Sequence, residues 1–131
     1  MLVRDLGLKD YDELWNLQRR LVFERGAGES PDTVLLCQHT PVYTIGRSSR
    51  QTVPEDLPYP VRRVERGGDL TYHGPGQLVV YPLLDLRRLG LGVRELVVAL
   101  EDAVIALVAR YGIGATGSRA APGVYVGARK L

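Results

Sequence analysis

Residues 66–77 read Arg-Gly-Gly-Asp-Leu-Thr-Tyr-His-Gly-Pro-Gly-Gln and stand between two apolar, strand-like runs. The four glycines permit positive φ angles and let backbone N–H groups come close to a ligand, because no Cβ stands in the way. The run is therefore typical of a substrate-binding loop. It is equally compatible with a hairpin that has a rigid turn at Gly74-Pro75-Gly76. Composition alone leaves both interpretations open.

Short runs rich in β-branched residues and bounded by Gly or Pro lie on both sides of this segment. They predict strands at residues 33–37, 42–45, 61–64, 78–83, 113–116 and 123–128. Pro82 cannot donate a backbone hydrogen bond, so it marks a strand end or an edge strand.

Two helices are predicted from apolar residues that recur at helical spacing. The first follows Asp10, a candidate N-cap, and carries Leu14, Leu17 and Leu21 on one face. The second covers residues 93–110, and Gly112 ends it.

These elements predict the α+β class. We expect residues 1–131 to form a single domain with a mixed, largely antiparallel central sheet flanked by helices, and residues 48–60 to form a polar surface loop. If related sheets continue beyond Leu131, this chain has an unpaired edge, and we expect self-association or poor solubility.

The bulk composition excludes several function classes. The chain has 17 Lys+Arg and 15 Asp+Glu, a net charge of +2, and this balance does not suggest a basic stripe for nucleic acid or a membrane surface. No run is long and apolar enough for a membrane span or a signal peptide, and one cysteine cannot form an internal disulfide. We therefore expect a cytoplasmic protein. His39 and His73 are too far apart to suggest a metal site, and we expect His39 to organise a turn.

The run RGGDLTYHGPGQLVVYPLLDL, residues 66–86, resembles the signature of the octanoyltransferases of lipoate synthesis, within the wider family of lipoate-protein and biotin-protein ligases. LLCQHTPVYTIGR at residues 35–47 and APGVYVGARKL at residues 121–131 resemble the same family, in the same order. The resemblance spans most of the chain and implies the fold of that family, a central sheet with helices packed outside it.

The resemblance implies an acyltransferase. It would move an octanoyl group from acyl carrier protein to a lysine of a lipoyl domain, in the 2-oxoacid dehydrogenases or the glycine cleavage H protein. No cofactor is implied. One alternative is an ATP-dependent lipoate-protein ligase, which forms an acyl adenylate and needs no cysteine. Another is a non-catalytic fragment that binds an acyl group or a carrier protein.

By resemblance, the acyl substrate is bound by the segment from Arg66 to His73: Arg66, Gly67, Gly68, Asp69, Leu70, Thr71, Tyr72 and His73. The glycines offer backbone amides, and Thr71 and His73 offer hydrogen-bonding side chains. His73 could also donate or accept a proton near neutral pH.

Lys130 matches the family lysine that is expected to lower the pKa of a nucleophilic cysteine. That cysteine is expected well after this lysine, whereas the chain ends at Leu131. The resemblance thus implies either a piece of a longer enzyme or a partial relative. Cys37, the sole cysteine, follows Val34-Leu35-Leu36 in a predicted buried strand, so we expect it to behave as a small hydrophobic residue and not as the nucleophile.

Overall fold

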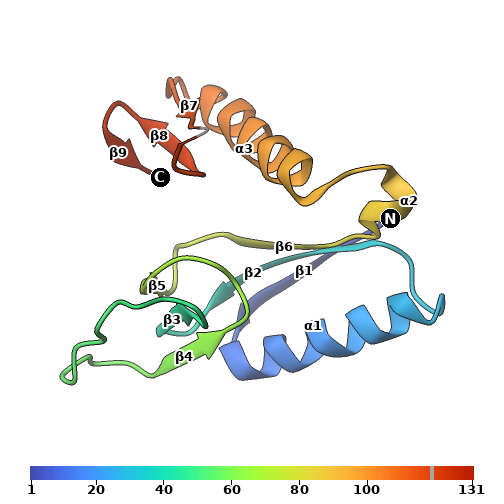
Figure 1. The fold of residues 1–131 in the computed structure, drawn as a ribbon, viewed down its shortest axis with the longest axis horizontal. Helices are drawn as coiled ribbons and strands as arrows, with labels where there is room; N and C mark the ends of the chain where they lie inside the picture. The colour runs from blue at the N-terminus through green and yellow to red at the C-terminus, as the bar shows by residue number, and fades with distance from the viewer. Residues whose placement is uncertain (119) are drawn as a thin grey trace. The chain divides into compact units, whose positions relative to one another are not determined.

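The computed structural model describes residues 1–118 and 120–131, which form two compact units, Met1–Leu84 and Asp85–Leu131. In chain order, the first unit contains β1 (Leu2–Lys9), α1 (Tyr11–Gly26), β2 (Thr33–His39), β3 (Val42–Gly46), β4 (Val61–Val64), β5 (Thr71–His73) and β6 (Val79–Leu83) (Figure 1). The second contains α2 (Leu86–Leu89), α3 (Val93–Ala109), β7 (Thr116–Gly117), β8 (Val124–Val126) and β9 (Arg129–Lys130).

The first sheet of the first unit has the strand order β1-β2-β6. β1 and β2 run parallel and are joined through α1, whereas β6 pairs antiparallel with β2. Pro82 therefore lies in an edge strand, as predicted. β1 was not predicted. Most of its side chains are exposed, and its register shifts between Asp5 and Leu8, next to Gly7 with φ of +63°.

α1 lies along this sheet and supplies one side of its core (Figure 1). The spacing predicted from the sequence is confirmed, because Leu14 and Leu21 are buried against Leu35 and Cys37 of β2. Leu17 is partly buried at the margin of the same cluster. Burial of a leucine side chain stabilises a fold by about 1.5–3 kcal/mol, so Leu14 and Leu21 both contribute to the stability of this unit.

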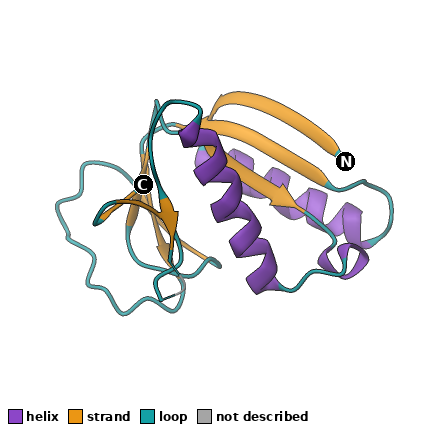
Figure 2. Cartoon of the chain, turned by 90° about the horizontal axis from the view of Figure 1, so that it is seen from above, coloured by secondary structure: helices purple, strands orange, loops and turns teal. Residues whose placement is uncertain are grey.

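The second sheet has the order β4-β3-β5, with β3 parallel to β4 and antiparallel to β5. The glycine-rich run connects this sheet to the first one, because β5 pairs with β3 and β6 pairs with β2. The predicted turn at residues 74–76 is present, with Gln77 N–H donating to Gly74 O at 3.2 Å. It does not close a hairpin between β5 and β6. The connection between β3 and β4, including residues 48–60, contains neither helix nor strand, as predicted (Figure 2).

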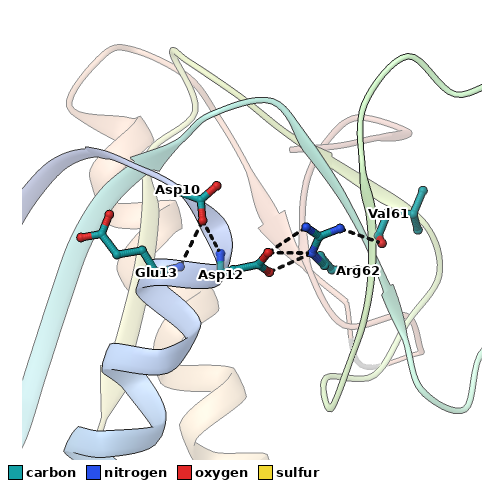
Figure 3. Close-up of polar contacts among 5 residues, drawn as sticks. All are labelled: Asp10, Asp12, Glu13, Val61 and Arg62. Atoms are coloured by element: carbon teal, nitrogen blue, oxygen red, sulfur yellow. Dashed lines mark hydrogen bonds and ion pairs between the residues drawn. The ribbon is translucent and has the colours of Figure 1, made fainter.

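An ion pair ties α1 to this second sheet (Figure 3). Asp10 caps the helix and accepts hydrogen bonds from the N–H groups of Asp12 and Glu13 at 2.9 and 3.1 Å. The carboxylate of Asp12 then accepts from Nε and Nη2 of Arg62 in β4, with shortest distances of 2.8 and 2.7 Å. A bidentate pair of this kind fixes orientation as well as distance.

In the second unit, α3 confirms the helix predicted at residues 93–110, and Gly112, with φ of +74°, follows its end. β7, β8 and β9 form a small antiparallel sheet. The strand predicted at residues 113–116 is wrong except for Thr116. The strand predicted at 123–128 is shorter, because Gly127, with φ of +59°, turns the chain into β9.

The α+β class and the mixed strand pairing are confirmed, and the strands described are divided among three sheets of three. No helix within residues 1–118 and 120–131 has the length and apolar character to span a membrane.

Candidate functional site

The glycine-rich loop, Arg66–His73, runs from the end of β4 into β5 and folds over the end of β3. Gly46, the last residue of β3, donates its N–H to Gly68 O at 3.0 Å. A Cβ at position 46 would collide with the carbonyl oxygens of Gly68 and Arg66. Gly68 itself has φ of +89°, which L side chains rarely adopt. Glycine on both sides of this contact therefore lets two backbones approach closely.

Arg66 points back into its own loop. Its Nη2 donates to Thr44 O at 2.7 Å and to Asp69 O at 2.9 Å, and its Nη1 donates to Gly67 O at 2.8 Å. Nε and Nη2 also lie 3.1 and 2.7 Å from Thr44 Oγ1. The guanidinium thus holds the loop carbonyl oxygens in place and shapes the site from within.

Thr44 links Arg66 to His73. Its side chain is buried, and its Oγ1 lies 3.0 Å from His73 Nε2. On the other side of the ring, His73 Nδ1 lies 2.6 Å from Gln77 Oε1. Because an amide oxygen can only accept, Nδ1 carries the proton, and Nε2 accepts from the Thr44 hydroxyl. His73 was predicted as a site residue, whereas Thr44 and Gln77 lie in the segments that resemble the family but were not predicted as site residues.

The connection between β3 and β4 braces the loop from outside. Ser49 Oγ donates to Asp69 Oδ1 at 2.6 Å, and Leu70 N–H donates to Gln51 Oε1 at 2.7 Å. Thr71 Oγ1 donates to the Asp69 carbonyl at 3.2 Å. The side chains of Asp69 and Thr71 therefore contribute to the loop conformation.

Tyr72 lies in β5 opposite Tyr43 of β3, so its side chain is on the other face of the sheet from that of His73. Its ring contacts those of Tyr43 and Tyr59, with centroids 5.4 and 6.0 Å apart, and it is 44% exposed. The structure thus brings Arg66, Thr44 and His73 together and places Tyr72 on the opposite face.

His39 is fully buried at the end of β2, and its side chain has a larger role than the turn predicted for it. Nδ1 donates to Lys9 O at 3.3 Å, so Nε2 accepts from the Tyr81 hydroxyl at 2.9 Å. Its ring lies edge-on to that of His73, with centroids 6.2 Å apart. Burial lowers the pKa of His39 and raises the pKa of Tyr81, so both groups are neutral at pH 7.

Cys37 lies in the core beneath these residues, with Sγ 3.8 Å from His39 Nε2. Burial, followed by the charge of Asp5, raises the pKa of the thiol. A protonated, buried thiol is a poor nucleophile, which agrees with the hydrophobic role predicted for it.

An apolar groove lies beside α1. Its lining includes Trp15, Val22, Phe23 and Leu83, and the Phe23 side chain is 77% exposed. We call it the α1 groove. It is another place in the first unit that has room for an acyl chain.

Lys130 belongs to the second unit. It pairs with Tyr125 across the β8–β9 hairpin, and Nζ donates to Pro122 O at 2.9 Å. Its aliphatic stem passes over Gly123, where a Cβ would collide with it. The Gly123 N–H donates to Glu101 Oε1 of α3 at 2.6 Å, so the helix anchors the backbone beneath the lysine.

The chain is similar in sequence to curated octanoyltransferases. Octanoyltransferases from Alkalilimnicola ehrlichii, Pseudomonas syringae pv. syringae and Laribacter hongkongensis are 52%, 50% and 47% identical to the chain. The alignments cover 98%, 98% and 100% of this chain but 60%, 59% and 63% of those proteins, so the chain spans about three fifths of the length of these curated relatives.

A solved structure of a T. acidophilum protein assigned as a lipoate protein ligase superposes with a TM-score of 0.62. It is 18% identical, and the match covers 98% of this chain and 59% of that one. At this identity, the match shows a shared fold alone. The family model described as the lipoyl protein ligase A/B catalytic domain matches residues 10–131, which include most of the first unit and all of the second. The chain therefore belongs to the lipoyl protein ligase A/B catalytic domain family.

Proposed function

We propose that this chain is the acyl-binding part of an octanoyltransferase. The enzyme would move an octanoyl group from acyl carrier protein to a lysine of lipoyl domains, in the 2-oxoacid dehydrogenases and the glycine cleavage H protein. The observation that carries the proposal is the identity of about one half to octanoyltransferases along nearly the whole chain. We place this reaction in the cytoplasm, treat residues 1–131 as part of one catalytic domain, and assign it no cofactor.

The glycine-rich loop is the proposed binding site for the acyl group. Its conformation is maintained by Arg66, which bonds the carbonyl oxygens of Thr44, Gly67 and Asp69. Arg66 therefore acts by shaping the loop, and an uncharged acyl group needs no cationic partner. Gly67 and Gly68 leave room for a ligand to approach the backbone, because both are exposed.

Lys130 is the proposed activating residue for a cysteine expected later in the sequence of longer relatives. An ammonium group beside a thiol favours the thiolate and lowers its pKa. In this chain the ammonium of Lys130 is already fixed to Pro122 O, which supports a defined position for the charge.

Titration calorimetry with octanoyl-loaded and unloaded acyl carrier protein, without ATP, tests the proposal. We expect the octanoyl form to bind more tightly, since only that form can fill the site. The Arg66→Lys variant loses the guanidinium fork, and we expect its affinity to fall about tenfold, or ~1.4 kcal/mol. Arg50→Lys, at an exposed arginine of the neighbouring loop, is the matched control and is expected to bind like the original chain.

Binding of free octanoate that depends on ATP would contradict the proposal and favour the ATP-dependent ligase. Equal affinity for loaded and unloaded carrier protein would also contradict it, because the acyl group would then contribute nothing.

A further inference from the structure

The two hydrogen bonds of His73 differ in their surroundings. On one side, Nε2 accepts from Thr44 Oγ1, and Thr44 is 1% exposed. On the other side, Nδ1–H donates to Gln77 Oε1 at the protein surface, across the Gly74-Pro75-Gly76 turn. The first partner is fixed by the fold, whereas the second is a side chain that solvent or a ligand can displace.

Arg66 determines which way the Thr44 hydroxyl points. Arg66 Nε donates to Thr44 Oγ1, Nη2 lies 2.7 Å from the same oxygen, and neither nitrogen can accept a hydrogen bond. The hydroxyl proton is then directed to His73 Nε2, and the ring proton must be on Nδ1. The hydrogen bonds that join Arg66 to Thr44 and Thr44 to His73 therefore leave one oriented N–H group of His73 directed toward the surface. Successive hydrogen bonds of this kind polarise one another.

Gln77 Oε1 is an sp² carbonyl oxygen. The acyl thioester that the proposed function brings to this loop has the same kind of oxygen. An N–H group held in advance toward such an oxygen stabilises the negative charge that develops when the carbonyl carbon is attacked.

We propose that His73 Nδ1–H donates a hydrogen bond to the carbonyl oxygen of the acyl substrate, that Gln77 occupies this donor in the ligand-free chain, and that Thr44 is the positioning residue that fixes the ring tautomer. This assignment rests on the proposed function, and it gives His73 the role of an oxyanion donor in place of a proton shuttle.

The tautomer is tested without any ligand, by ¹⁵N NMR of the imidazole nitrogens. The chain contains two histidines, so a His73→Asn variant assigns the signals. We expect Nδ1–H for His73 in the original chain and in Thr44→Ser, which keeps the hydroxyl. In Thr44→Val, which keeps the shape but has no hydroxyl, we expect a mixture that contains Nε2–H.

The donor role is tested with an unreactive probe, the amide analogue of octanoyl-pantetheine with a ¹³C-labelled carbonyl. We expect a downfield shift of the bound carbonyl signal that disappears in His73→Asn. Gln77→Ala removes the competing acceptor and should bind the probe about threefold to tenfold more tightly, whereas Thr44→Val should bind about tenfold more weakly, with Thr44→Ser close to the original chain.

Two results separate this inference from the proposed function. Binding of the probe with equal affinity and an equal carbonyl shift in every variant would overturn the role of His73 and leave the proposed function standing. Absence of binding in all variants, together with the expected tautomer, would overturn both.

Discussion

Gly46, the last residue of β3, packs directly against the backbone of the glycine-rich loop. The carbonyl oxygens of Arg66 and Gly68 occupy the space that a Cβ at this position would need. Both obstacles are backbone atoms, so neither can rotate away. Gly67, one residue before Gly68, has open space around its Cα and does not have a positive φ.

We predict that Gly46→Ala lowers the free energy of unfolding by about 1–3 kcal/mol, because the loop must shift to admit a methyl group. Gly67→Ala is the matched control, with an expected change within about 0.5 kcal/mol. Urea unfolding followed by circular dichroism measures both. Equal stabilities of the two variants would contradict the close approach of β3 and the loop.

The thiol of Cys37 is buried in the core of the first unit. The thiol is 2% exposed and its pKa is raised by burial, so we expect alkylation by iodoacetamide to be slow in the folded chain and fast in urea. Intact mass after timed incubation measures the rate. Rapid labelling under native conditions would instead show an accessible, reactive thiol and would reopen the question of a catalytic role.

Among the elements, α1 and β4 are joined by the pair of Asp12 and Arg62, which lie 50 residues apart. The hydrogen bonds from Arg62, more than its charge, hold the pKa of Asp12 below its ordinary value of 3.8. The side chains are 45% and 37% exposed, so solvent screening keeps the contribution small.

We predict that Asp12→Asn lowers the free energy of unfolding by about 0.5–1 kcal/mol at neutral pH. The folded pKa is depressed, so the contribution is fully present above pH 3.8 and is lost as the pH falls through the folded pKa. Glu13→Gln is the control, since it also removes an acid from the first turn of α1, together with the exposed pair of that acid with Lys9, but leaves Arg62 paired. A difference between the two variants that does not change with pH would argue against the ion pair.

The elements also show what the sequence could predict. α3 was found because its apolar residues repeat at helical spacing over seventeen residues. β1 was not found, because its apolar residues do not alternate and Gly7 interrupts the strand. The residues of the candidate site were likewise predicted only in part. His73 and the glycines stood out by residue type, whereas Thr44 lies 29 residues from His73 in sequence and becomes a neighbour only when β3 pairs with β5.

The exposed apolar residues of α3 affect how the protein behaves in solution. Val98, Leu100, Val104 and Leu107 are each at least 39% exposed, and none of the described side chains of this helix is buried. Apolar patches on a helix promote association. We predict that the 131-residue chain self-associates as its concentration rises, which sedimentation velocity measures. A monomer at every concentration would contradict this prediction.

The glycine-rich loop in the first unit is the proposed binding site of the acyl group. Amide chemical shifts of the ¹⁵N-labelled chain, recorded during titration with octanoyl-loaded and then unloaded acyl carrier protein, test it most directly. We expect the signals of residues 66–73 and of Gln77 to move with the octanoyl form and much less with the unloaded form. Shifts that depend on the acyl group but cluster around Trp15, Val22 and Phe23 would place the acyl chain in the α1 groove and contradict the claim.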